Sequence, residues 1–344
     1  MERLAYKKPP VENKEYFLRE MVSWFERGQI FLTALEIDLF TKLKEPKTSE
    51  ALSMEMGTCY EITCRFLDVL VALGFLSKHG DRYLTAPNVA PFLVEGEPYF
   101  AKYLKSAVEE RDSWIKLKQI LHEGPSVIPT PKHARFDRES INWLARGVML
   151  GRLQATLKIV SELPEFRNAK RLIDLGGGHG LYSIAFAQEN PWLEVTVFDL
   201  PGVTDVAEEY INEYGMQDRV RTMAGDFTRD SIGSGYDIAF EAHAFGGNKD
   251  GLRLLYQKVS DALNDNGLFI SEAHTLNDDR TGPPVPLIWE LKDYMTGHSK
   301  THLFPTNAEL FDIFGEVGLS GERVINLPSQ EESQNRMVIA RKRI

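Results

Sequence analysis

The sequence predicts an α/β fold in which a mostly parallel, doubly wound sheet of seven strands follows a domain of helices. From about residue 171 onward, short apolar runs alternate with helical patterns, which is typical of a parallel sheet covered by helices on both faces. The first 100 residues instead carry helical apolar stripes and one hairpin signal. A chain of 344 residues can bury a core in each of two domains. We expect a first domain at 1–100, a helical connector at 101–150 and the sheet domain at 151–344.

The first domain is predicted from two helical segments and a hairpin. Residues 30–39 form a broad apolar stripe at helical spacing. Thr58 and Glu61 have the spacing of a capping box, which predicts that a second amphipathic helix opens there. Residues 74–85 follow as two short strands around Gly80. Helices followed by a small hairpin indicate a winged helix.

A winged helix often suggests DNA binding, which requires lysine and arginine side chains that displace counterions from phosphates. The second predicted helix offers only Arg65, against Glu61 and Asp68. The whole chain carries a formal charge of −10, which repels nucleic acid. The sequence therefore favours a use other than nucleic-acid binding for this domain.

Residues 88–150 are predicted to be mainly helical. Residues 121–125 interrupt the helices, and residues 125–131 predict an extended connector because they contain three prolines. An apolar stripe from Trp143 to Met149 predicts the start of a long helix that leads into the sheet domain. Such a stripe can face a ligand pocket or simply pack in the core.

The sheet domain opens with a strand, a glycine-rich turn, a helix and a second strand within residues 171–200. The apolar strand 172–175 stops at a turn that contains Gly176, Gly177, Gly178 and Gly180. Glycine allows a positive φ and lets the backbone approach a ligand where a Cβ would collide. The next strand ends on Asp199, and an acid in this position can accept both hydroxyls of a ribose. The pattern predicts a nucleoside-cofactor site at the carboxyl ends of these strands.

The glycine spacing indicates which nucleoside binds. Dinucleotide folds require G-x-G-x-x-G, whereas the third glycine here, Gly180, comes one residue early. No arginine or lysine follows closely to meet a phosphate. S-adenosyl-L-methionine has no phosphate but carries an amino-acid end and a sulfonium, groups that suit an acidic opening such as Asp174. The alternative, a plain tight turn, is disfavoured by the two acids at the strand ends.

Five more segments complete the predicted sheet. Strand 220–224 ends in Gly225-Asp226-Phe227, where Asp226 can accept a hydrogen bond from an adenine amino group and Phe227 can lie against the ring. A strand-end turn with Phe227 in the core is the alternative. The remaining strands are predicted at 236–241, 267–272, 323–325 and 337–340, the last two as an antiparallel edge.

Four motifs carry a resemblance to a known family: DLGGGHG at 174–180, FDLPGV at 198–203, AGDF at 224–227, and the glycine-to-glutamate strand 267–272. The chain from about Leu144 onward resembles class I S-adenosyl-L-methionine-dependent methyltransferases, which have a Rossmann-like fold. It resembles more narrowly the small-molecule O-methyltransferases, which include hydroxyindole, plant phenolic and bacterial polyketide enzymes. The predicted cofactor is S-adenosyl-L-methionine, with S-adenosyl-L-homocysteine as product. The predicted cofactor residues are Asp174, Gly176, Gly178, Asp199, Leu200, Gly225, Asp226, Phe227 and Glu241.

The resemblance also implies partners. In the family, the winged-helix module is a dimerisation element that covers the partner's acceptor site, so a homodimer through the N-terminal domain is expected. The other partner is a small-molecule methyl acceptor. The residues expected to face this acceptor are Trp143, Met149, His274 and Met295.

Methyl transfer to a hydroxyl needs a base, usually a histidine. The resembled enzymes place it in a His-Asp-Trp motif after the fourth strand, but the family's position falls here on Gly246. His243 lies three residues earlier and is the predicted catalytic base, with a pocket-wall or solvated histidine as the alternative. His274 is a second candidate. Glu290 is the predicted acid that orients the base.

A metal site is not expected. His298 and His302 are four residues apart, but no cysteine or glutamate-rich pattern accompanies them, and Gly297 and Pro305 favour a loop. Cys59 and Cys64 are the only cysteines and fit small helix positions rather than a disulfide or metal pair. The sequence shows no membrane-length apolar run and no signal peptide, so a cytoplasmic location is expected.

The leading hypothesis is methyl transfer from S-adenosyl-L-methionine to a hydroxyl of an aromatic or polyketide-like small molecule. A carbon, nitrogen or sulfur acceptor is the second hypothesis, because it would need less proton removal and would explain the missing motif. The third is a cofactor-binding relative that does not transfer methyl groups.

Overall fold

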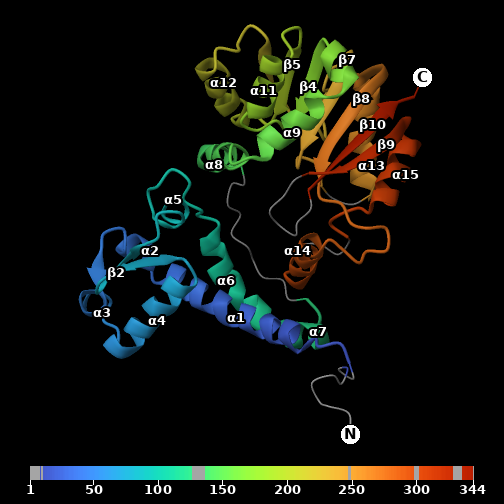
Figure 1. Ribbon diagram of the computed structural model, residues 1–344. Coiled ribbons are helices and arrows are strands. Elements are labelled where there is room, and N and C mark those ends of the chain that lie inside the picture. The colour runs from blue at the N-terminus through green and yellow to red at the C-terminus, as the bar shows by residue number, and fades with distance from the viewer. Residues whose placement is uncertain are drawn as a thin grey trace. The chain divides into compact units, whose positions relative to one another are not determined.

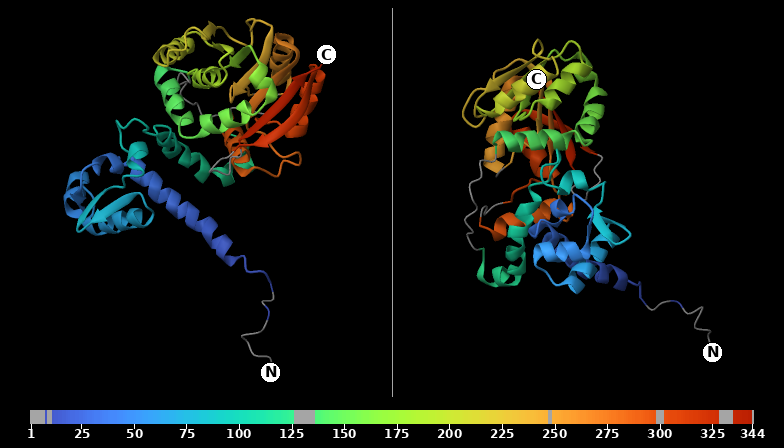
Figure 2. Two further views of the ribbon diagram at one scale, coloured as in Figure 1. Left: turned by 45° about the horizontal axis from the view of Figure 1, so that its top comes forward. Right: turned by 90° about the vertical axis from the view of Figure 1, so that its left-hand side faces the viewer.

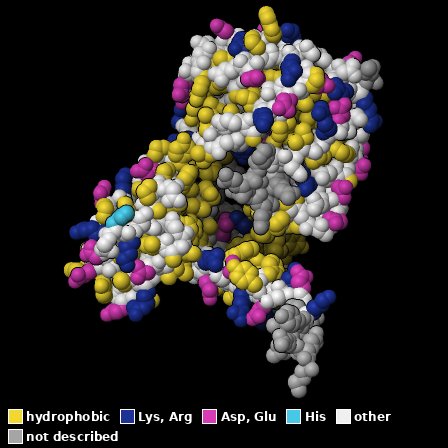
Figure 3. Space-filling model, in the orientation of Figure 1, with side chains coloured by type: hydrophobic (Ala, Val, Ile, Leu, Met, Phe, Trp, Pro, Cys, Tyr) yellow, Lys and Arg dark blue, Asp and Glu magenta, His cyan; other side chains and the backbone are white. Residues whose placement is uncertain are grey.

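The computed structural model describes residues 8, 11–125, 136–246, 249–297, 302–327 and 335–343 (Figure 1). The chain forms two compact units, Met1–Lys116 and Leu117–Ile344, each of which has its own apolar core. The helices predicted for the connector 101–150 are divided between these units. On the face drawn in Figure 3, basic and acidic side chains are interspersed with apolar ones.

The first unit contains six helices and a small sheet among its described residues. The apolar stripe predicted at 30–39 is divided by Asp38, whose φ of 53° ends the first helix and starts the second. Strands β2 and β3 form the predicted hairpin, and β1 pairs with β3. The elements are α1 (Glu15–Glu36), α2 (Leu39–Lys42), β1 (Lys47–Thr48), α3 (Ser49–Met56), α4 (Tyr60–Ala72), β2 (Leu76–His79), β3 (Arg82–Thr85), α5 (Ala90–Leu93) and α6 (Leu104–Ile115).

The predicted capping box at Thr58 does not form. Helix α4 begins at Tyr60 with Cys59 as its N-cap, so Thr58 lies one residue too early to cap it. The Thr58 hydroxyl instead lies 2.7 Å from that of Thr63. A capping box does occur in the second unit, where Thr306 and Glu309 cap α15 reciprocally, and the sequence analysis did not identify it.

The second unit is built on a seven-stranded sheet, as predicted, and the order of its strands is β6-β5-β4-β7-β8-β10-β9. Strands β4 to β8 are parallel, and β10 pairs antiparallel with both β8 and β9. Side chains alternate between two cores, since Leu172 packs with α9 and α11 while Ile173 packs with α13 and α15. The strands are β4 (Arg171–Leu175), β5 (Glu194–Asp199), β6 (Val220–Ala224), β7 (Tyr236–Ala242), β8 (Leu263–Ala273), β9 (Leu319–Asn326) and β10 (Arg336–Lys342).

Helices cover both faces of this sheet (Figures 1 and 2). The long helix predicted from Trp143 onward is two helices, because Gly151, with a φ of 124°, separates α8 from α9. Residues 126–131 of the predicted connector lie outside the described residues. The helices are α7 (Leu117–Glu123), α8 (Arg138–Val148), α9 (Arg152–Ser161), α10 (Pro164–Asn168), α11 (Leu181–Glu189), α12 (Val203–Glu213), α13 (Lys249–Ala262), α14 (Pro284–Met295) and α15 (Asn307–Glu316).

None of the helices in the described ranges combines the length and the apolar character that crossing a membrane requires.

Helix α13 offers a matched pair of residues that tests the core between this helix and the sheet. Leu252 is 3% exposed and Leu254, two residues later on the same helix, is 55% exposed. We expect Leu252→Ala to lower the free energy of unfolding by about 2–5 kcal/mol, because it leaves a cavity. Leu254→Ala should change it by less than about 0.5 kcal/mol. Urea unfolding measures both, and equal losses would contradict the assignment of this core.

Candidate active site

The glycine-rich turn after β4 adopts a conformation that side chains disfavour. Gly176, Gly178 and Gly180 have φ values of 64°, 56° and 71°. A Cβ added at Gly176 would lie 2.4 Å from the Cβ of Ala244, in the loop after β7. A Cβ at Gly178 would meet nothing closer than a backbone oxygen at 3.9 Å, so open space lies beside that residue. The turn thus packs tightly on one side and leaves room on the other.

Asp199, at the end of β5, lies against this turn. Its carboxylate accepts hydrogen bonds from the backbone N–H of Gly178 at 2.8 Å and of Leu200 at 2.7 Å. Burial raises the pKa of Asp199, although these two donors oppose the shift. The side chain is partly exposed, and its oxygens have lone pairs left to accept further donors such as ribose hydroxyls.

Asp174 lies beneath the turn and not in its opening. Its side chain is 1% exposed, and one oxygen accepts a hydrogen bond of 2.7 Å from the Ser183 hydroxyl. A Cβ at Gly177 would come within 2.9 Å of it, so Asp174 supports the turn from below. Burial raises the pKa of Asp174 to about 7. This position differs from the acidic opening that the sequence analysis expected.

Residues 225–227 form a second loop at the same edge of the sheet. Gly225 packs on Phe198, since an added Cβ would lie 2.7 Å from that ring. Asp226 accepts hydrogen bonds from the backbone and the hydroxyl of Thr228, at 2.9 and 2.6 Å. Phe227 is half-buried, and its ring centroid lies 5.1 Å from that of Phe245. The two rings help to line a small hollow, together with Leu175, Ile232, Leu255, Lys258 and Val259.

Glu241, at the end of β7, is fully buried. It accepts hydrogen bonds from the hydroxyl of Ser271 and from the backbone N–H of Ala244. Burial raises the pKa of Glu241 to about 7. Glu241 was predicted to contact the cofactor, but in this structure it holds the loop 243–245 from inside.

His243 is the first residue of that loop and has a left-handed backbone, with a φ of 56°. Its N–H donates to the carbonyl oxygen of Glu272 at 2.8 Å, and its Nε2 lies 3.4 Å from the Glu272 carboxylate. Glu272 is the last residue but one of β8, the strand adjacent to β7, and its side chain is buried. In the sequence Glu272 is only the end of a strand motif, and its position beside His243 is visible only in the structure.

Three more side chains surround the Glu272 carboxylate. Thr156 donates to Oε2 at 2.7 Å, the Tyr182 hydroxyl donates to it at 3.5 Å, and the Nε of Arg152 lies 3.9 Å from Oε1. Burial acts to raise the pKa of Glu272, but the His243, Thr156 and Arg152 side chains outweigh it and hold that pKa below its usual value. Glu272 is therefore an ionised acid beside the predicted base.

An aromatic wall continues from His243. The His274 ring lies 4.6 Å from the His243 ring, and Trp289 and Phe304 meet His274 edge-on at 5.0 and 5.8 Å. The structure therefore brings both candidate histidines together. We call His274, Trp289 and Phe304 the aromatic wall.

Glu290 does not orient His243. Its carboxylate accepts hydrogen bonds from the backbone N–H of Leu303 at 2.7 Å and of Phe304 at 3.4 Å, and lies 3.1 Å from Nδ1 of His302. It fixes the segment that carries Phe304, because α14 places it toward this segment. The acid whose carboxylate lies beside His243 is Glu272. His298 lies outside the described residues.

The remaining predicted acceptor residues are spread over α8 and α14. Trp143 is half-buried, Met149 is 42% exposed at the end of α8, and Met295 is 2% exposed at the end of α14. The burial of Met295 differs from the expected exposure toward an acceptor. Across the described ranges, no group of three or more histidine, cysteine or acidic residues is arranged to hold a metal ion.

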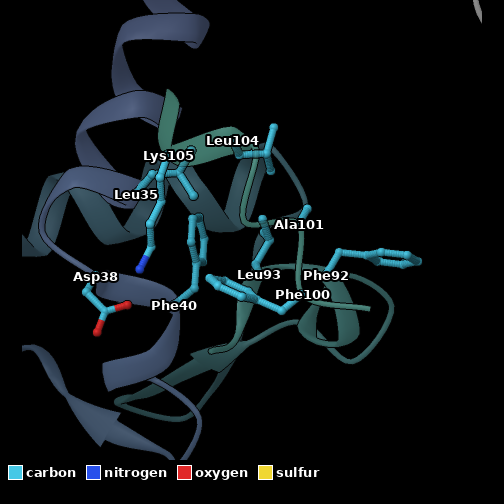
Figure 4. Close-up of a pocket in the computed structure, with 9 residues that line it drawn as sticks. All are labelled: Leu35, Asp38, Phe40, Phe92, Leu93, Phe100, Ala101, Leu104 and Lys105. Carbon is cyan, nitrogen blue, oxygen red and sulfur yellow. The ribbon is translucent and has the colours of Figure 1, made fainter. Parts of the chain in front are cut away.

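A separate hollow lies in the first unit (Figure 4). Phe40, Phe92 and Phe100 contribute apolar walls, and the Lys105 ammonium lies 5.3 Å from the Phe100 ring centroid. None of the residues that line it is among the candidate catalytic or cofactor residues, so it is not the candidate active site.

The buried acid below the turn predicts a pH dependence of stability. Because the pKa of Asp174 is about 7 in the folded state and about 4 when unfolded, the folded state binds its proton more tightly. This carboxyl should therefore contribute a fall in stability of about 2 kcal/mol as the pH rises from 5 to 7, and Glu241, whose pKa is raised in the same way, should add to it. Asp174→Asn, which keeps an acceptor for Ser183, should make the decline in urea unfolding less steep by the share of Asp174. The exposed Asp265→Asn is the control, and an unchanged slope in Asp174→Asn would refute the assignment.

Comparison with known proteins identifies the family. The sequence model of the family described as an O-methyltransferase domain matches residues 135–299 of this chain. An L-tyrosine C(3)-methyltransferase of Streptomyces lavendulae is 32% identical over 77% of each chain, and a 3-hydroxy-5-methyl-1-naphthoate 3-O-methyltransferase of Streptomyces sahachiroi is 25% identical over 93% of this chain and 94% of its own. Human N-acetylserotonin methyltransferase, solved in complex with S-adenosyl-L-methionine, shares the fold with a TM-score of 0.68 at 17% identity, over 98% of this chain and all of its own. The chain therefore belongs to the O-methyltransferase family of S-adenosyl-L-methionine-dependent methyltransferases.

Proposed function

We propose that this enzyme transfers a methyl group from S-adenosyl-L-methionine to a hydroxyl of an aromatic or polyketide-like small molecule. The observation that carries the proposal is the pairing of His243 with the buried Glu272, beside the aromatic wall and at the same edge of the sheet as the glycine turn. Relatives whose names state oxygen as the acceptor include the naphthoate enzyme and a tetracenomycin 8-O-methyltransferase of Streptomyces glaucescens.

The residues at the strand ends fit the cofactor. Open space beside Gly178 allows close approach of a ligand, and the Asp199 carboxylate next to it can accept ribose hydroxyls. Asp226 and Phe227 offer an acceptor and a ring face for an adenine, while Leu200 and Gly225 shape the same edge. Asp174 and Glu241 act from inside by supporting the turn and the loop. When bound, S-adenosyl-L-methionine supplies an electrophilic methyl group on a positively charged sulfur.

His243 acts as the general base in this proposal. Its imidazole accepts the proton of the acceptor hydroxyl while the oxygen forms a bond to the methyl carbon and the bond from that carbon to sulfur breaks. The charge moves to the imidazolium, which Glu272 stabilises from 3.4 Å. S-adenosyl-L-homocysteine and the methyl ether are the products. The aromatic wall supports a flat acceptor next to His243.

A carbon, nitrogen or sulfur acceptor remains the second candidate. The names of other relatives support it, because they include an N,N-dimethyltransferase of Streptomyces rimosus and the L-tyrosine C(3)-methyltransferase. The atom that carries the new methyl group in the product distinguishes these candidates.

The N-terminal unit is proposed to be a winged helix that forms a homodimer. Two helices, α3 and α4, precede the hairpin β2–β3, which is the order that a winged helix requires. Helix α1 exposes a continuous apolar surface, which is typical of an interaction site. Its exposed apolar residues are Tyr16, Phe17, Leu18, Met21, Val22, Trp24 and Phe25.

Removal of the base tests the catalytic assignment. We expect His243→Ala to lower the single-turnover rate at saturating cofactor by at least about tenfold, equivalent to roughly 1.4 kcal/mol of transition-state stabilisation. His79→Ala, an exposed histidine of the first unit, is the matched control. A loss smaller than tenfold in His243→Ala would remove this residue as the general base.

Charged substitutions on α1 test the proposed dimer interface. Phe17 and Phe25 are 56% and 68% exposed, so replacing both with glutamate should leave the fold intact and disrupt an apolar interface. Sedimentation at micromolar concentration should show a dimer for the wild type and a monomer for the double variant. Met54→Glu, at a residue 78% exposed on α3, should remain dimeric. A wild type that sediments as a monomer, or a double variant that stays dimeric, would refute this interface.

A further inference from the structure

Lys258 is a cation beside the loop 225–230 that the proposed mechanism does not use. It lies on α13 and lines the hollow that Phe227 and Phe245 also line. Its ammonium donates hydrogen bonds to the backbone carbonyl oxygens of Phe227 at 2.7 Å and Asp230 at 3.0 Å. A charged donor makes a stronger hydrogen bond to a carbonyl than a neutral donor does. Lys258 therefore fastens this loop to α13.

The loop that Lys258 holds is closed at residues 226 and 230. The backbone N–H of Asp226 donates to the Asp230 carboxylate at 2.8 Å, and the N–H of Asp230 donates to the carbonyl oxygen of Asp226 at 2.7 Å. The two bonds of Lys258 reach the same turn, at Phe227 and at Asp230. Lys258 thus fixes the position of a compact turn rather than that of a single residue.

The Asp226 carboxylate has one oxygen bound within this turn and one left for a ligand. Oδ1 accepts from the backbone N–H and the hydroxyl of Thr228, whereas Oδ2 lies 3.7 Å from Nε of Arg229, and the side chain is 37% exposed. The hydrogen bonds from Thr228, with the charges of Arg229 and Lys258, hold the pKa of Asp226 below its usual value. Asp226 is therefore ionised at neutral pH and can accept a hydrogen bond from outside.

Ring contacts hold the Phe227 side chain but do not orient the carboxylate next to it. The Phe227 ring centroid lies 5.1 Å from that of Phe245, which in turn lies 5.8 Å from that of Tyr256 on α13. Apolar contacts are not directional. The hydrogen bonds of Lys258 are, because they require two carbonyl oxygens at defined places. The direction in which Asp226 presents its second oxygen therefore depends on Lys258.

We propose that Lys258 is a positioning residue that makes the cofactor site selective for adenine over hypoxanthine. This inference rests on the proposed contact between Asp226 and the adenine amino group. Hypoxanthine carries an oxygen in place of that amino group and a hydrogen on the adjacent ring nitrogen. A carboxylate held in one place accepts from the amino group and repels the oxygen, whereas a carboxylate on a loop free to move can turn to the ring N–H.

Paired ligands test the proposal by calorimetry on the full-length protein. The probes are S-adenosyl-L-homocysteine and S-inosyl-L-homocysteine, which differ in the group at position 6 of the purine. The wild type should bind the adenosyl compound at least about tenfold more tightly. Lys258→Met should reduce this preference to below about threefold, because the adenosyl compound loses affinity and the inosyl compound does not.

Two further variants serve as rescue and control. Lys258→Arg keeps N–H donors for both carbonyl oxygens, so its preference should stay above about threefold. Lys249→Met removes an exposed lysine from the first turn of the same helix and should keep the full preference.

Three results would overturn the proposal: a wild type without preference, an unchanged preference in Lys258→Met, or an equal loss of both ligands in that variant. The last result would mean that Lys258 serves only the fold. Thermal melting shows whether each variant is folded. Lys258→Gln, whose side chain is shorter and uncharged, has the same expected loss and replaces Lys258→Met should the latter not fold.

Asp226→Asn separates this proposal from the cofactor contact on which it rests. If Asp226→Asn keeps the preference of the wild type, the proposed adenine contact of Asp226 fails, and the role of Lys258 fails with it. If Asp226→Asn loses the preference and Lys258→Met keeps it, the contact stands and the role of Lys258 alone fails. These measurements need no methyl acceptor, so transfer to a hydroxyl stands or fails independently of them.

Discussion

The turn after β4 and the loop after β7 approach each other so closely that Gly176 has no room for a side chain. An added Cβ would lie 2.4 Å from that of Ala244, and a positive φ of 64° at Gly176 directs the turn to this contact. Ala244 follows His243 directly, so the same contact relates the turn assigned to the cofactor to the residue assigned as base. The loop is held from inside by Glu241, which accepts from the backbone of Ala244. The turn that we propose to bind the cofactor and the loop that we propose to carry the base therefore pack directly against each other.

Four acids lie at or near the strand ends. We assign two of them to structural support of the site and two to the reaction or to ligand binding. Asp174 and Glu241 are buried, no ion pair joins either of them to a cation in the described part of the chain, and burial raises the pKa of each to about 7. Glu272 is also buried, but His243 and Arg152 hold its pKa below the usual value, so it stays ionised. Asp199 keeps partial exposure beside the turn and remains available to a ligand. Burial alone therefore does not decide the charge of these acids, because neighbouring cations keep the buried Glu272 ionised.

Much of the sheet could be predicted from sequence because its strands are short apolar runs bounded by glycines and acids. The seven-stranded, mostly parallel sheet and the antiparallel edge at 323–325 and 337–340 are confirmed. Two local predictions were wrong, since Thr58 does not cap α4 and Gly151 divides the helix that begins before it. A capping spacing does not fix where a helix starts, and the effect of one glycine depends on the packing around it.

The partner of His243 was harder to predict than His243 itself. The resemblance implies that the helix of Glu290 lines the acceptor pocket, whereas in the structure Glu290 contacts residues 302–304. The signal for Glu272 was present in the sequence, because parallel neighbouring strands end at the same edge and Ala242 and Glu272 share a register position. The position of Arg152 near Glu272 could not be predicted from the sequence, because α9 precedes the sheet and reaches this edge of it only through tertiary packing.

The most direct measurement of the central claim is the affinity of S-adenosyl-L-homocysteine for Gly176→Ala, determined by calorimetry. Gly215→Ala is the control, because Gly215 has a φ of 65° but nothing within 4 Å of an added Cβ. We predict that Gly176→Ala weakens binding at least about tenfold, a cost of roughly 1.4 kcal/mol, and that Gly215→Ala changes it less than about threefold. Equal affinities in the two variants, or a wild type that does not bind the compound at all, would contradict the account.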